Sequence, residues 1–74
     1  MVKEDKKSIN DLLEHGRKIH SMGYLTEAKK VYEKVLKLDS KIAEAYFLLG
    51  SAAYQMSKYK TAEANIKQAI KIDS

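Results

Sequence analysis

The chain has no cysteine, proline or tryptophan and only three glycines among its 74 residues. Without cysteine, neither a disulfide framework nor a cysteine-based zinc site can stabilise the fold, which leaves His15 and His20 as the strongest candidate metal ligands. The isolated glycines and the missing proline also argue against a flexible linker. Because so short a chain buries only about 60% of the surface that it exposes when unfolded, we expect one small domain of marginal stability.

Long apolar runs are missing as well. The run that contains Tyr46 to Leu49 is far shorter than the ~20 apolar residues that a helix needs to cross a bilayer. The polar start MVKEDKKS leads into no signal-peptide core. We therefore expect a cytoplasmic protein without a membrane-spanning segment.

The formal net charge of +4 could favour nucleic acid or a membrane surface. On a helix, four lysines at spacings of four, three and four would form one basic stripe. The stripe carries no interleaved aromatic residues for base stacking, so we interpret it as a solvated helix face. Phosphate binding and an acidic protein partner are the alternatives. The stripe consists of Lys30, Lys34, Lys37 and Lys41.

The strongest signal is an internal repeat of 34 residues. Sliding the sequence by this period aligns Gly16 with Gly50 and Ala28 with Ala62, and it places LKLDS directly on IKIDS. Such a period is typical of stacked helical repeats. We therefore divide the chain into a polar N-terminal tail, a first repeat and a second repeat, with bounds 1–8, 9–42 and 43–74.

Each repeat contains two helical patterns separated by a break. Gly23 supplies a permissive backbone for the first break, HSMGY, while MSKYK marks the second break without a glycine. Ser8 with Asp11, and Thr26, are the expected N-terminal caps of the first two helices. The sequence thus predicts an all-α fold of two tandem antiparallel helix–turn–helix hairpins, with helices at 9–22, 25–38, 42–56 and 59–72.

Two glycines fall inside these helices, where each costs about 1 kcal/mol relative to alanine. We expect Gly50 to face Ala62 and Gly16 to face Ala28, so that the antiparallel backbones approach closely. His15 takes a core-facing position, which favours a hydrogen-bonded structural histidine.

The pattern resembles the tetratricopeptide repeat, a 34-residue helix–turn–helix family. The second repeat carries Tyr46, Leu49-Gly50, Ala53, Tyr54, Tyr59, Ala62 and Ile66, and the first carries Leu12, His15-Gly16, Ile19, Leu25, Ala28 and Tyr32. The chain departs from the family pattern where Ser40 and Ser74 replace the usual closing proline and where His15 replaces leucine.

The resemblance implies a non-catalytic protein-interaction module that holds a peptide or helix of a partner on the concave face made by the first helix of each repeat. On this reading Phe47, Leu48 and Tyr54 form an apolar centre; the alternative is that they pack against the first repeat. Carried over by position, the face comprises Asn10, Leu13, Glu14, Arg17, His20 and Ser21, followed by Glu44, Phe47, Leu48, Ser51, Tyr54 and Gln55.

The last helix suggests a second hypothesis, because repeat arrays normally need about three units and a polar capping helix. Ile66, Ala69 and Ile70 would lie partly uncovered, which monomers tend to avoid. The chain would then be a self-assembling homo-oligomer or a fragment of a longer array.

No catalytic grouping or glycine-rich phosphate loop emerges from the sequence, so we expect neither an enzyme nor a cofactor. His15 and His20 lie about 500° apart around a helix, so they do not share a face and we expect no metal site. A nucleic-acid partner ranks third, after a protein partner and a second copy.

Overall fold

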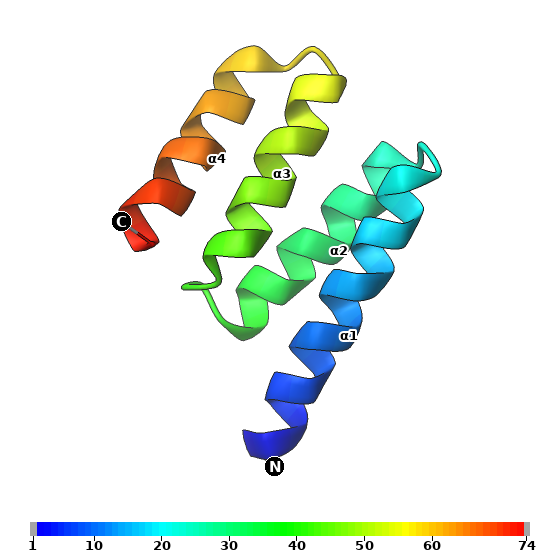
Figure 1. Ribbon diagram of the computed structural model, residues 1–74, viewed down its shortest axis with the longest axis vertical. Coiled ribbons are helices and arrows are strands. Elements are labelled where there is room, and N and C mark those ends of the chain that lie inside the picture. Colours follow the sequence, from blue (N-terminus) through cyan, green and yellow to red (C-terminus); the bar gives the residue numbers. More distant parts are fainter. Residues whose placement is uncertain (1, 74) are drawn as a thin grey trace.

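The computed structural model describes the backbone of residues 2–73 and the side chains of residues 8–73. Four helices follow one another side by side, and the described chain contains no strand (Figure 1). This confirms the all-α fold of two tandem hairpins. Side chains before residue 8, which belong to the predicted tail, and Ser74 lie outside the described residues. The helices are α1 Val2–Ser21, α2 Leu25–Leu38, α3 Ala43–Gln55 and α4 Tyr59–Ile72.

The 34-residue pattern located three helices to within one residue at each end, whereas α1 begins seven residues before its predicted start. Ser8 and Asp11 therefore lie inside α1, and the predicted cap is wrong. No proline or glycine precedes them to stop the helix. The prediction for Thr26 is also wrong, because Tyr24 occupies the N-cap position of α2 without a side-chain cap bond.

Both predicted breaks are confirmed by left-handed backbone conformations. Gly23 has a φ of 92°, which glycine adopts at no steric cost. Ser57 takes the same region at 63° although it has a side chain. The α3 helix ends there with a 2.8 Å hydrogen bond from the Lys58 amide to the Ala53 carbonyl. Serine thus makes a turn that the sequence pattern left without a glycine.

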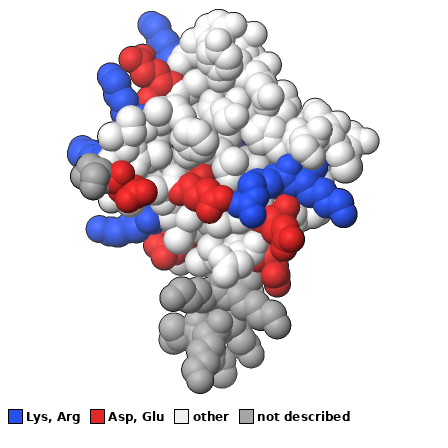
Figure 2. Space-filling model, viewed as in Figure 1, with Lys and Arg blue, Asp and Glu red and all other residues white. Residues whose placement is uncertain are grey.

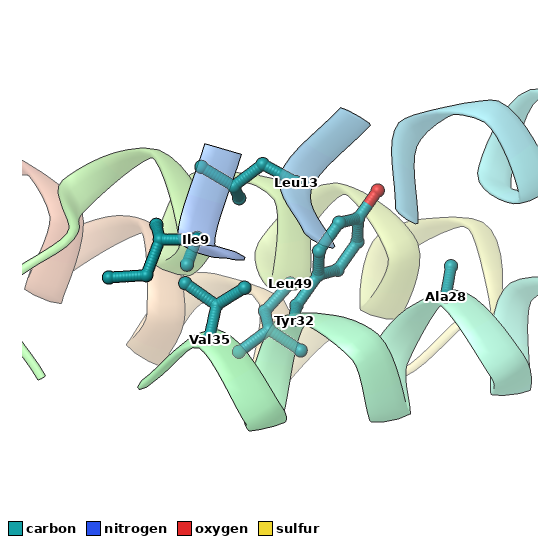
Figure 3. Packing of buried hydrophobic residues seen from close by; sticks show 7 residues of the cluster. Ile9, Leu13, Ala28, Tyr32, Val35 and Leu49 are labelled. Carbon is teal, nitrogen blue, oxygen red and sulfur yellow. The ribbon is translucent and has the colours of Figure 1, made fainter. Parts of the chain in front are cut away.

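The core lies between the first three helices (Figure 3). Tyr32 and Val35 of α2 are its largest fully buried side chains. In the described part of the chain α4 packs onto α3 alone and contributes nothing to this cluster. The buried cluster consists of Ile9, Leu13, Ala28, Tyr32, Val35, Ala45 and Leu49.

The two helical glycines face different neighbours. A Cβ at Gly50 would lie 3.1 Å from the Ala62 carbonyl oxygen and 2.6 Å from the Cδ1 of Ile66, so the predicted approach to Ala62 is confirmed. A Cβ at Gly16 would lie 2.5 Å from the Tyr32 ring. The nearest neighbour of Gly16 is thus the Tyr32 side chain, while its predicted approach to Ala28 stays a prediction.

His15 is exposed, which corrects its predicted place in the core. Its repeat equivalent, Leu49, is buried because α3 packs against the first hairpin. Within the described chain, no helix lies on the corresponding side of α1. The α1 outer face, which we define as Asp11, His15 and Lys18, is therefore polar and exposed, whereas the equivalent residues Ala45, Leu49 and Ala52 are all buried.

Candidate partner-binding groove

Two apolar residues of the predicted concave face pack in the core or against it and are not free to contact a partner. Leu13 is 5% exposed and belongs to the core cluster, and Leu48 is half-buried against it. Both lie where α1 and α3 approach each other, so α3 covers the side of α1 that a partner would have to reach. The alternative that Leu48 packs against the first hairpin is the correct one.

Polar residues of the same face join the helices to one another. Arg17 of α1 forms an ion pair with Glu44 of α3. The His20 Nε2 lies 2.6 Å from the Gln55 Oε1, and its Nδ1 lies 2.9 Å from the Tyr32 hydroxyl oxygen. Because an amide oxygen can only accept, Nε2 donates to Gln55, and with the proton on Nε2 the Nδ1 accepts from the Tyr32 hydroxyl. The contacts of Arg17 with Glu44 and of His20 with Gln55 join the two hairpins, while that of His20 with Tyr32 lies within the first.

Burial raises the pKa of Tyr32 above its usual 10.0, and the charge of Glu44 acts in the same direction while that of Arg17 opposes it. As the pH rises, the unfolded chain therefore loses this proton first. The stability that the group contributes is fully present below pH 10.0 and is lost as the pH passes through the higher folded-state value.

We therefore expect a Tyr32→Phe variant to lose less thermal stability than the wild type as the pH rises above about 10. Phenylalanine has no proton to lose, so the difference between the two melting temperatures should shrink with rising pH. Melts followed by circular dichroism from about pH 8 to pH 11 measure it. Parallel losses in the two proteins would contradict the raised pKa.

Three other residues of the predicted face come together in one groove between α3 and α4. Phe47 and Tyr54 are 57% and 66% exposed, Ser51 lies between them, and the groove has a volume of about 600 Å³. The Tyr54 ring packs edge-on against that of Tyr59, with centroids 5.3 Å apart. We call this the α3–α4 groove; it is lined by Phe47, Gly50, Ser51, Tyr54, Tyr59, Ala62, Glu63, Ile66 and Lys67.

The three predicted self-association residues all lie on α4, but they differ in exposure. Ile66 is half-buried in the groove, and Ile70 is 60% exposed in a neighbouring hollow of about 320 Å³. Ala69 is buried, so its predicted exposure is wrong. Phe47 lines both hollows and stands between them.

The sequence reasoning missed Tyr59 as a site residue and the charged rim residues Glu63 and Lys67. The signal that could have found Tyr59 is the repeat itself, because this residue stands 34 positions after Leu25 of the first hairpin. Asn10, Glu14 and Ser21 are exposed on α1, outside the groove.

Charge is unevenly distributed over the face seen in Figure 2. Charged side chains gather at the left edge, along α4, and in a band across the middle of the view, while the upper right of this face carries none. The lysines of the basic stripe are all exposed. Residues 8–73 contain no cluster of acidic residues and histidines that could hold a metal ion. None of the described helices is long and apolar enough to span a bilayer.

Two stacked hairpins with an apolar groove at one end define a helical repeat protein, a class whose general role is to bind other proteins. Residues 16–57 match the family described as TPR repeat, and residues 43–74 match the one described as tetratricopeptide repeat. The chain belongs to the tetratricopeptide repeat family, and the resemblance seen in the sequence is confirmed.

The chain is also similar to neutrophil cytosol factor 2 of Bos taurus, with 39% identity over 49 residues. The match covers 66% of this chain but only 9% of the bovine protein. No solved structure matches the chain.

Proposed function

We propose that this protein is a non-catalytic interaction module that binds a helix of a partner protein in the α3–α4 groove. The observation that carries the proposal is the group of aromatic side chains around the groove. Phe47, Tyr54 and Tyr59 are each more than half exposed and surround a floor formed by Gly50 and Ala62. Exposed aromatic side chains beside a pocket are typical anchors of protein interfaces.

The first hairpin indicates what such a groove holds. The side of the first hairpin that contacts α3 includes Leu13, His20 and Tyr32. Thirty-four residues later the same positions are Phe47, Tyr54 and Ile66, which line the groove. An α-helix therefore fits the groove by the geometry already used inside the chain, which is the helix-in-groove mode of recognition.

The chemistry of the occupant differs from that of α3 in one respect. Arg17 of the first hairpin pairs with Glu44, but the equivalent position of the second hairpin is Ser51. The groove thus offers no cation at this point. We expect the partner helix to present an apolar stripe and to lack the acidic residue that α3 carries.

The test uses a fluorescein-labelled helical peptide with the sequence of residues 43–55 and its Glu44 changed to alanine. We expect saturable binding in fluorescence anisotropy, weakened about tenfold or more by Phe47→Ala, as for a hot-spot residue. Tyr24→Ala is the matched control, because Tyr24 is an aromatic residue that is 55% exposed outside the groove. Absence of saturable binding, or an equal loss in the control, would overturn the proposal.

Self-association is the second candidate function, and the exposure of Ile70 beside Phe47 favours it. Phe47 thus has exposed apolar surface on both sides, and together these form a larger continuous apolar patch than single scattered side chains would. In a longer repeat array, the first helix of a following repeat would take the same place.

We also propose a cytoplasmic location. The support is the name of the bovine relative, neutrophil cytosol factor 2. Fractionation of cells with an antibody to this chain tests the location, and recovery with membranes would contradict it.

A further inference from the structure

We infer that self-association produces a two-fold symmetric dimer, in which α4 of each copy lies antiparallel to α4 of the other across the α3–α4 groove. The inference rests on the second candidate function and adds its geometry. It starts from one stripe of α4 whose members recur at spacings of three and four and therefore share a helix face. The stripe consists of Tyr59, Glu63, Ile66, Lys67 and Ile70, all of which line the groove or the neighbouring hollow.

The two ends of the molecule are unlike, which excludes stacking of copies head to tail. For such stacking, α1 of one copy would have to enter the groove of another as α3 enters the first hairpin. The α1 outer face would then place Asp11, His15 and Lys18 against apolar side chains. Burying unpaired charges in apolar surroundings is strongly unfavourable. We therefore pair the two α3–α4 ends, and a contact between identical surfaces is two-fold symmetric.

Under this symmetry the acidic rim residue of each copy, Glu63, meets the basic rim residue of the other, Lys67. Within one copy, the Lys67 Nζ lies 3.5 Å from the Glu63 Oε2, and both side chains are largely exposed. A two-fold axis perpendicular to α4, at the level of Asn65, brings Glu63 of each copy opposite Lys67 of the other. Two ion pairs then form between the copies. The same axis brings Tyr59 of each copy to within one residue of Ile70 of the other, which covers exposed apolar surface on both.

The area available makes this dimer weak. Aromatic side chains bury on the order of 150–250 Å² each when fully covered. Since Phe47, Tyr54 and Tyr59 are each more than half exposed, covering them together with Ile70 removes on the order of 1,000 Å² of surface over two copies, the lower limit of a specific interface. The net charge of +4 on each copy opposes association. We therefore expect dissociation in the micromolar range or weaker, so that a partner helix can displace the second copy.

Charge reversal tests the geometry in the full chain. Sedimentation equilibrium over a hundredfold concentration range should show a monomer–dimer equilibrium for the wild type. Glu63→Lys and Lys67→Glu should each weaken the dimer about tenfold or more, because each places like charges opposite one another. The double variant E63K/K67E should recover the wild-type constant. Lys67→Glu also reduces the net charge. If only the net charge mattered, this variant would therefore strengthen association, whereas the paired geometry predicts that it weakens the dimer.

Asp11→Lys on the α1 outer face is the control: it raises the net charge by two, as Glu63→Lys does, and should weaken the dimer far less than Glu63→Lys. All substituted side chains are exposed, and circular dichroism verifies that each variant folds. A wild type that stays monomeric throughout would overturn self-association and this inference together, while leaving binding of the peptide untouched. A wild-type dimer that the double variant does not recover, or that Asp11→Lys weakens as much as Glu63→Lys does, would overturn the two-fold geometry alone.

Discussion

A Gly16→Leu variant is expected to lose more than about 3 kcal/mol of its free energy of unfolding, the upper end of ordinary overpacking. Even a Cβ at this position would lie 2.5 Å from the Tyr32 ring. That ring cannot move aside, because it is fully buried and its hydroxyl is hydrogen-bonded to His20. A chain of this length has a total stability of about 4–11 kcal/mol, so a large fraction of the variant should be unfolded. Urea denaturation followed by circular dichroism measures the loss.

Gly50→Leu is the matched comparison, with an expected loss of about 1–3 kcal/mol. A Cβ at Gly50 would meet the Cδ1 and Cγ1 of Ile66, at 2.6 and 2.8 Å, and this side chain is half-exposed and can rotate toward the groove. Helix propensity changes equally at both positions. The difference in stability between the two variants therefore measures how far the neighbouring side chain, Tyr32 or Ile66, can move aside. If Gly50→Leu proved the more damaging of the two, the neighbouring backbone of Ala62 rather than the ring of Tyr32 would be the tighter constraint.

Truncation of Tyr32 to alanine should be the second severe change, at about 3–5 kcal/mol. Tyr32 belongs to the cluster that joins the first three helices, and its side chain is completely inaccessible. Its loss leaves a cavity in this core. We expect a broad transition and a midpoint at much lower urea concentration.

The Tyr32→Phe variant separates ring packing from the hydroxyl group. Loss of one hydrogen bond should cost only about 1 kcal/mol, although the Nδ1 of His20 is left without this partner. If the phenylalanine variant were as unstable as the alanine variant, the polar contact with His20 would matter more than the packing of the ring.

The helices themselves could be predicted because their signals are local. The apolar spacing and the repeat located α2 and α4 to the residue, and the break at Gly23 needs only the backbone freedom of glycine. The start of α1 could not be predicted, since it depends on the absence of a stop signal rather than on a cap. Ser8 is an effective cap only where the preceding residues leave the helix.

The groove could be predicted only in part, because exposure depends on which neighbours a helix has. Phe47 and Leu13 stand at equivalent positions of the two hairpins, yet one is exposed and the other buried. The difference arises because α3 covers the first hairpin, while no described helix covers the second. His15 and Leu49 differ for the same reason on the opposite side of the array. Family position therefore indicates a side chain's direction, but the order of the hairpins decides whether it is free.

The packing of α4 on α3 alone has a consequence for how the groove binds. A helix held by a single neighbour is the part of a repeat protein that opens locally at the lowest free energy. Half of the binding surface is thus supplied by the least secured element, and any molecule that fills the groove also secures α4. Part of the free energy of binding is then spent on suppressing this local opening, so affinity for the occupant and protection of the α4 amides from hydrogen exchange should rise and fall together.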